Sequence, residues 1–493
     1  VSFWSRIRTT GIRTEVNTGS GYTVVDSYAL KHTYPDPGDG TTPALWLDSI
    51  QHTGGSGTGA ITLPPVTFEG IKLANRADST VDNAPAMVHY RISVLTSETG
   101  EKIGVNYRTE CAAPVSLDPA TNTSLCYPVY WAKVGQQSPS RDWFHKYVVA
   151  EVDDQDPTGK SSPVTTSYEY LDGGAWHFDD NELVKPAQRT YGQWRGFGRV
   201  RTRLGAGVDA KTLSETRYFR GMDGDTLPNN GRRSVSIGLS PDAPVAGAAA
   251  SVPDTDELGG SVREEITYDG DGGPALSATV SDYWVGPVVA TRTRPGLDPV
   301  TAQLVRTVGT RTATAITSTV PKTWRSTRTE TSYDTTSGLV TAAYDHGDLT
   351  RPEQATCTTT SYTAPNTALN LVNLVAATQV VALPCAGSGV NGLSAPVTVT
   401  PDDVISRTRT FYDTPTFDTT WPQPAPTVGD INVTQRSTTG AAGALVYLTT
   451  GTSSFDGYGR PVGSTDANGN SSTVAYTMAN GLTTGVVSTD PLG

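Results

Sequence analysis

Short segments of alternating side chains recur along the chain, and several of them end in an aromatic residue followed by aspartate. Residues 327–334 read Thr-Arg-Thr-Glu-Thr-Ser-Tyr-Asp, and residues 261–269 and 405–413 end in the same pair. Alternation of this kind is typical of β-strands with two unlike faces. The 33 prolines and 50 glycines are spread through the sequence and would interrupt any long helix. The pattern therefore predicts an all-β protein.

The aromatic–aspartate pair is the most frequent part of a candidate repeat. A tyrosine ring stacked on the next strand buries apolar area while its hydroxyl keeps a hydrogen-bond partner. The aspartate can accept hydrogen bonds from backbone amides and start a turn. We expect this structural role for five pairs: Tyr268–Asp269, Tyr333–Asp334, Tyr344–Asp345, Tyr412–Asp413 and Phe455–Asp456.

One complete unit lies near the C-terminus. Its motif residues are Phe455, Asp456, Gly459, Arg460, Thr465, Asp466, Gly469 and Tyr476. Glycine at position 459 permits a backbone conformation closed to other residues, and Asn-Gly at 468–469 is typical of a hairpin turn. The element Thr-Asp-x-x-Gly returns as Thr489, Asp490 and Gly493, so that positions 465 and 489 are 24 residues apart. A fixed spacing of this size indicates a repeat of β-hairpins that need neighbours to bury their faces.

The first part of the chain lacks clear repeats. Residues 1–160 contain long loops rich in glycine and proline, such as 35–40 and 54–59. We predict a distinct N-terminal β region at 1–160 and degenerate repeats over 161–493, with the sequence stopping inside a repeat.

Four cysteines lie in two local pairs. Cys111 and Cys126 flank a loop rich in Pro, Asn and Thr, and Cys357 and Cys385 flank a longer segment. Neither pair is Cys-x-x-Cys, and no histidine lies at zinc spacing. We therefore predict two disulfides, 111–126 and 357–385, and an oxidising compartment.

Charge and motifs narrow the function classes. The net charge is −12 without a basic stripe, which argues against nucleic-acid binding. No apolar run has the length of a membrane span. No catalytic, phosphate-binding or metal-binding signature is complete, so we predict no enzyme, no metal and no cofactor. His177 beside Asp179 and Asp180 could serve acid–base chemistry, but a structural histidine is favoured.

The repeat resembles the Rhs/YD-repeat family. The resemblance lies in Phe455-Asp456, Gly459-Arg460, Thr465-Asp466-Ala-Asn-Gly469 and a strand ending in Tyr476. Residues 36–48 and 176–225 are also similar to the long Rhs proteins of actinobacteria. The family includes shells of bacterial polymorphic toxins, the cocoons of insecticidal toxin complexes and the teneurins.

This resemblance implies a fold and a role. Such repeats spiral into a hollow β-shell, which in the toxins encloses a variable C-terminal effector. We therefore expect a structural shell fragment of a secreted or cell-surface bacterial protein that encapsulates and delivers its own C-terminal toxin domain. That domain and the self-cleaving aspartyl site of the family would lie beyond residue 493, and the export signal would lie upstream. Asp490-Pro491 is assigned no proteolytic role.

Two alternatives remain. The many Tyr and Trp side chains could stack on sugar rings, which would make the chain a carbohydrate-binding or adhesion module that contacts cell-surface glycan. A glycoside hydrolase with two carboxylates is the less favoured alternative, because nothing in the sequence pairs the acidic residues.

Overall fold

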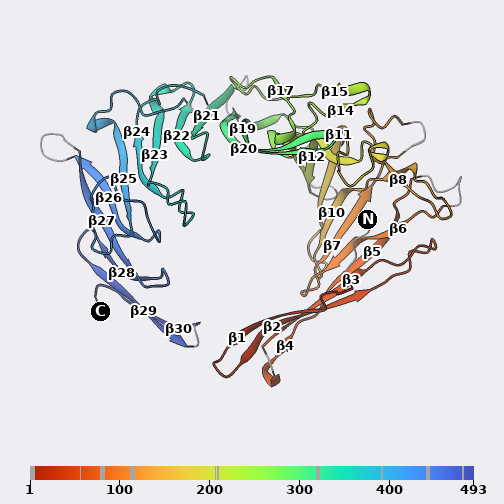
Figure 1. Ribbon diagram of the computed structural model, residues 1–493, viewed down its shortest axis with the longest axis horizontal. Helices are drawn as coiled ribbons and strands as arrows, with labels where there is room; N and C mark the ends of the chain where they lie inside the picture. The colour runs from red at the N-terminus through yellow and green to blue at the C-terminus, as the bar shows by residue number, and fades with distance from the viewer. Residues whose placement is uncertain are drawn as a thin grey trace. The chain divides into compact units, whose positions relative to one another are not determined.

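The computed structural model describes residues 6–55, 57–77, 84–111, 117–205, 207, 210–317, 323–389, 392–439, 445–479 and 482–492. Strands make up 56% of the structure and helix 4% (Figure 1). The helical residues lie in three-residue 3-10 turns such as Pro186–Gln188. The all-β prediction is confirmed.

The chain forms two compact units. Unit 1 comprises Val1–Thr279 and Ala290–Ala302, and unit 2 comprises Val280–Val289 and Gln303–Gly493. The long strands β19 (Ala275–Arg294) and β20 (Leu297–Ile316) pair with each other and contribute residues to both units. The predicted boundary at residue 160 concerns repeat content, and it stays a prediction. The strand β10, which precedes residue 160, pairs with β11, which follows it, so one sheet contains both sides of this position.

Unit 1 contains a sheet in which each strand pairs antiparallel with the next one named. The strands are β1 (Gly11–Asn17), β2 (Tyr22–Thr33), β3 (Trp46–Gly54), β5 (Val66–Ala74), β6 (Val88–Thr96), β7 (Lys102–Arg108), β10 (Val148–Gln155), β11 (Val164–His177), β12 (Gln193–Leu204), β13 (Thr212–Tyr218) and β18 (Val262–Tyr268). The short β4 (Ile61–Thr62) also pairs with β3.

Within the described part of the chain, three small two-stranded ribbons accompany this sheet. They are β8 (Cys126–Trp131) with β9 (Ser140–His145), β14 (Thr226–Leu227) with β15 (Gly231–Arg232), and β16 (Ser236–Gly238) with β17 (Ser251–Pro253).

Unit 2 is an antiparallel meander, coloured green to blue in Figure 1. From β20 onward each strand pairs with its successor. The strands are β21 (Thr323–Tyr333), β22 (Val340–Asp348), β23 (Thr356–Tyr362), β24 (Val375–Val381), β25 (Val404–Tyr412), β26 (Ile431–Thr439), β27 (Leu445–Phe455), β28 (Pro461–Asp466), β29 (Ser471–Ala479) and β30 (Leu482–Thr489).

The aromatic–aspartate pairs coincide with strand ends. β18, β21, β25 and β27 end at the aromatic residue of a predicted pair, and the aspartate follows as the first residue of the connection. The pair Tyr344–Asp345 is the exception, since it lies inside β22. The alternation of side chains therefore extends to the aromatic residue because the strand ends there. The aspartate is the first residue of the turn that follows.

The interior contains charged as well as apolar side chains. Arg76, Arg263, Glu215 and Glu264 are each at most 1% exposed. The Nε of Arg76 lies 2.6 Å from Oδ2 of Asp142, to which the indole of Trp131 also donates. Burying a charge is tolerated only when it is paired and hydrogen-bonded. Buried ion pairs such as Arg76–Asp142 therefore form part of the interior beside the apolar side chains.

Candidate functional site

The corner after β27 shows what the complete motif does. Oδ1 of Asp456 accepts hydrogen bonds from the amides of Tyr458, at 2.9 Å, and Arg460, at 3.1 Å. Oδ2 of the same carboxylate lies 2.6 Å from Nη2 of Arg460, and the Arg460 Nε donates to it at 2.8 Å. Between them Gly459 adopts a φ of +73°, which side chains disfavour. One carboxylate thus closes the turn and holds the arginine.

The arginine links this corner to the next strand. Its guanidinium carbon lies 4.3 Å from the ring centre of Tyr476 and 5.0 Å from that of Tyr458. Such contacts are cation–π interactions. The Tyr476 hydroxyl donates to the carbonyl of Pro461 at 3.0 Å. The hydrogen bond from Arg460 is the main cause that lowers the pKa of Asp456, so the corner carboxylate stays ionised.

The corners without Gly-Arg keep the carboxylate and change its donors. Asp334 accepts from the amide and hydroxyl of Ser337, at 2.7 and 2.8 Å. Asp413, whose own φ is +56°, accepts from four consecutive amides, those of residues 427–430. In these two corners the aspartate closes the turn without an arginine.

The remaining motif residues follow the same rule in part. Asp466 accepts from the amides of Asn468 and Asn470, and Asp345 from that of Gly347. Asp490 accepts from the amide of Leu492. The hydroxyl of Thr465 shares a hydrogen bond with that of Ser471 across the hairpin, and Gly469 has a φ of +83°. The backbone N–H of Asp269 donates to the carbonyl of Pro274, and Thr489 is the last residue of β30. Gly493 lies outside the described residues. The assignment of these residues to a family motif stays a prediction.

A recurring tyrosine contact joins neighbouring strands. In five cases the hydroxyl donates to a backbone carbonyl of the preceding strand, at 2.7–3.0 Å: Tyr170 to Val149, Tyr333 to Thr307, Tyr362 to Val340, Tyr412 to Val375 and Tyr476 to Pro461. Burial raises the pKa of the first four phenols, so they remain donors. Sequence reasoning missed Tyr362, because Thr363 follows it in place of aspartate.

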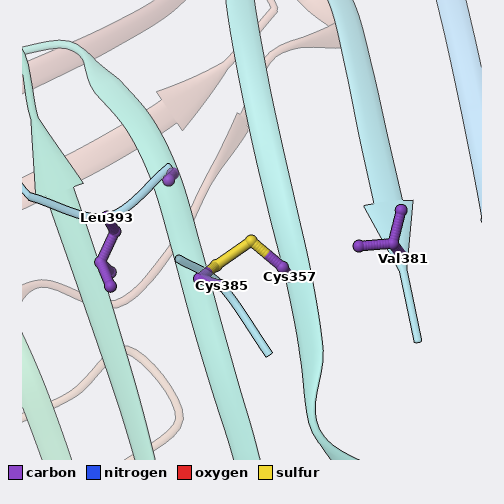
Figure 2. Packing of buried hydrophobic residues seen from close by; sticks show 5 residues of the cluster. Cys357, Val381, Cys385 and Leu393 are labelled. Carbon is purple, nitrogen blue, oxygen red and sulfur yellow. A yellow bond between two sulfur atoms is a disulfide. The ribbon is translucent and has the colours of Figure 1, made fainter. Parts of the chain in front are cut away.

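Both predicted disulfides are present. Cys111 is bonded to Cys126 and Cys357 to Cys385, with Cα–Cα distances of 5.3 and 4.9 Å. Figure 2 shows the second bridge with Leu393 to one side and Val381 to the other. These residues and Ala342 form a buried apolar cluster. The bridge thereby fixes the segment after β24 to the start of β23.

Unit 1 contains a cavity of about 430 Å³ beside the corner after β18. It is lined by Arg201, Arg203, Leu213, Asp242, Tyr268 and residues 271–275. The Tyr268 hydroxyl donates to Oδ2 of Asp242 at 2.8 Å. Burial and this hydrogen bond raise the pKa of Tyr268, which keeps the phenol protonated. Tyr268 thus differs from the other corner tyrosines, because its partner is a side chain that lines a cavity.

The wall of the cavity rests on an ion-pair network across β12, β13 and β18. Arg201 donates through Nε to Glu215 at 2.8 Å. Arg217 lies 3.2 Å from Glu215 and 3.3 Å from Glu264, and both carboxylates are buried. Burial raises the pKa of Glu264. No local sequence signal marked this network, since its members come from separate strands.

The histidine candidate has different partners from those the sequence placed beside it. Nε2 of His177 lies 3.3 Å from Oδ1 of Asp225, while its Nδ1 lies 2.8 Å from the carbonyl of Phe178. Asp180 pairs with Arg294 instead. The favoured structural reading of His177 agrees with these contacts, because both ring nitrogens face protein groups.

Within the ranges that the structure describes, no three His, Cys, Asp or Glu side chains are grouped to hold a metal ion. No helix among the described residues has the length and apolar character needed to cross a membrane.

Comparison with known proteins gives matches at the level of structure. No protein-family model and no curated protein matches the sequence. The crystal structure of TcdB2–TccC3–Cdc42 matches with a TM-score of 0.50 and 14% identity, over 94% of this chain and 27% of that one. The crystal structure of TcdB2–TccC3 matches with a TM-score of 0.47 and 13% identity, over 97% of this chain and 31% of that one. The fold is similar to that of the chain matched in TcdB2–TccC3–Cdc42. The chain spans less than a third of either matched chain.

Proposed function

We propose that the chain is a wall segment of a Rhs/YD-repeat shell, which encloses a toxin domain carried by the same parent polypeptide and delivers it to a target cell. In this role the chain itself is structural and catalyses no reaction. The single observation that carries the proposal is the corner architecture. At corners such as 455–460 a carboxylate closes the turn, and in five cases a tyrosine hydroxyl ties a strand to its predecessor, which suits a wall built from repeats.

The fold supports the same role. The similarity to TcdB2–TccC3–Cdc42 extends over nearly all of this chain but only a part of the other. This partial coverage is what we expect if the chain forms one segment of a larger shell wall. A sequence identity of 14% supports only the fold. The enclosed toxin and its delivery are therefore inferred from the predicted repeat and its resemblance to the Rhs/YD-repeat family.

We further propose a secreted or cell-surface location. Two disulfides with no free cysteine among the described residues favour an oxidising compartment. The buried position of Cys357 and Cys385 supports a structural bridge.

The test uses the full-length parent protein. Limited proteolysis should leave the C-terminal domain intact for at least ten times longer when it is attached to the shell than when it is expressed alone. The attached domain should also be inactive until the shell is unfolded. A mixture of separately expressed shell and domain provides the control, because enclosure requires one folding event. If the attached domain is cut as fast as the free one and is fully active, the packaging role is wrong.

A further inference from the structure

The cavity at the corner after β18 carries positive and negative groups side by side. Arg203 and Asp271 both line it, and Nε of the arginine lies 2.9 Å from Oδ1 of the aspartate. Arg201 and Asp242 add a second guanidinium group and a second carboxylate. A ligand with a single charge would be attracted by one set of groups and repelled by the other at a similar distance. The lining therefore suits a ligand that carries both charges close together.

The paired groups keep hydrogen-bonding capacity for such a ligand. A guanidinium group has five N–H donors in a planar fork. Within the described ranges, the carboxylates beside Arg203 are those of Asp271 at Nε and Glu169 at Nη1, both at 2.9 Å, which leaves Nη2 for a ligand. Asp271 uses Oδ1 for this pair, and Asp242 uses Oδ2 to accept from Tyr268. The second oxygen of each aspartate can therefore accept from a cationic group.

The turn of residues 269–274 holds one of these carboxylates at the rim. Gly272 has a φ of +80°, and a Cβ on Gly273 would collide with the carbonyl oxygen of Asp269, so the tight turn requires glycine here. The side chain of Asp271 is 41% exposed, and the cavity is therefore open to solvent on this side. Groups that are already fixed lose little freedom on binding, which favours affinity.

The floor of the cavity is apolar. Leu213, Tyr268 and Ala275 line it and are 6%, 8% and 4% exposed. A hydrocarbon side chain that covers these groups would remove further apolar area from water, which favours binding. The volume of about 430 Å³ lies within the range of about 300–1,000 Å³ found for small-molecule sites. The site thus combines a charged rim with an apolar base.

We propose that this cavity binds a free α-amino acid with an apolar side chain. Nη2 of Arg203 donates to the α-carboxylate, Asp271 and Asp242 accept from the α-ammonium group, and the floor takes the side chain. Both groups of the ligand are charged at neutral pH. Because a single carbon atom joins them, the adjacent charges of an arginine–aspartate pair match their separation. All residues of the site belong to unit 1, and binding needs no enclosed domain, so the inference goes beyond the packaging role.

Calorimetry and saturation-transfer NMR with the complete 493-residue chain test the ligand class. The probes are glycine, L-alanine, L-leucine and L-phenylalanine. At least one of the last two should bind with a dissociation constant of about 1 mM or tighter, and glycine should bind more weakly because it lacks the apolar part. The N-acetyl derivative of the tightest-binding amino acid removes the ammonium charge, and its amide removes the carboxylate charge. Each derivative should bind at least about tenfold more weakly, because one charged set in the cavity then loses its partner.

Two substitutions test the residues of the site. Asp271→Asn keeps the shape and removes the negative charge, and should weaken binding about tenfold or more. Asp242→Asn should act in the same direction. It keeps an oxygen that can accept from Tyr268, which covers the case in which Asp271→Asn fails to fold. Asp334→Asn is the matched control, because Asp334 accepts from Ser337 in unit 2 and does not line the cavity. Its binding should equal that of the unchanged chain.

The outcomes that overturn the proposal concern the ligand and the residues separately. It fails if none of the four amino acids binds, if either derivative binds as tightly as the amino acid, or if every folded cavity variant binds as tightly as the unchanged chain. It also fails if D-glucose binds the cavity and the amino acids do not, because the site would then prefer a neutral ligand. Since no toxin domain takes part, these outcomes do not depend on whether the parent encloses one.

Discussion

At the scale of single residues, the corner aspartates that close a turn do so with different hydrogen-bond donors. Asp456 relies mainly on an arginine, and Asp413 relies on four backbone amides instead. Burial raises the pKa of Asp413, but the amides of residues 427–430 outweigh burial and lower it below its ordinary value. Hydrogen bonds that favour the charged form have this effect in general. The ionised carboxylate therefore stabilises the corner, and the protonated one does not.

This gives a pH dependence of known sign. Because the pKa of Asp413 is lower in the folded chain, its contribution is fully present above the unfolded pKa of about 3.9, and it is lost as the pH falls through the folded pKa. We expect the amides of residues 427–430 to lose protection from hydrogen exchange, corrected for the intrinsic rate, as the pH is lowered from neutral into this range. Asp413→Asn should already be less protected at neutral pH and should show a flatter profile.

Asparagine is the suitable replacement at this position because it tolerates the positive φ of Asp413. Thr477 and its neighbours in β29 provide an internal reference for exchange, since the Asp413 carboxylate bonds to the amides of residues 427–430 instead. Equal pH profiles for the two proteins would mean that the carboxylate contributes nothing to the corner.

At the scale of elements, the complete unit consists of a strand, a corner, a second strand and a hairpin turn. The corner at 455–460 needs one left-handed residue, and the sequence supplies Gly459. Gly457 lies in the same corner but has an ordinary φ, and a Cβ there would meet no atom within 4 Å. Two glycines two positions apart thus differ in whether the backbone requires them.

Alanine scanning of the corner should separate the two glycines. Gly459→Ala should cost about 1–2 kcal/mol, because a side chain in the left-handed region is strained. Gly457→Ala should cost nothing or stabilise slightly by restricting the unfolded chain. Local hydrogen exchange of β27 and β28 measures both, where 1.4 kcal/mol corresponds to a tenfold change. A larger loss for Gly457→Ala than for Gly459→Ala would contradict this account of the corner.

The elements also show what the sequence could predict. Corners such as 455–460 are encoded within a few residues, so the turn-forming roles of aspartate and glycine could be proposed from the local sequence, whereas the strand to which each tyrosine hydroxyl donates could not. The two disulfides were predictable because four cysteines lie in two local pairs. The cavity was not predictable, since Arg203, Asp242 and Tyr268 come from segments far apart in the sequence and meet only through the strand pairing of unit 1.

At the scale of the whole molecule, each of the two units has its own disulfide. Cys111–Cys126 lies in unit 1, and Cys357–Cys385 lies in unit 2. A disulfide stabilises mainly by restricting the unfolded chain, and the effect grows with the loop it closes. The residues of each pair are 15 and 28 apart. Each bridge should therefore act on the unfolding of its own unit.

Calorimetry of cysteine variants tests this division. The double substitution Cys357→Ala with Cys385→Ala should destabilise unit 2 by about 3–4 kcal/mol on the chain-entropy estimate, which for a unit of roughly 200 residues lowers its transition by about 6–16 °C. The transition of unit 1 should stay in place. The matched variant, Cys111→Ala with Cys126→Ala, should lower the other transition by a similar or smaller amount, because its loop is shorter. A single transition that both variants shift equally would show that the two units unfold as one body, and the division drawn from their contacts would then carry no thermodynamic meaning.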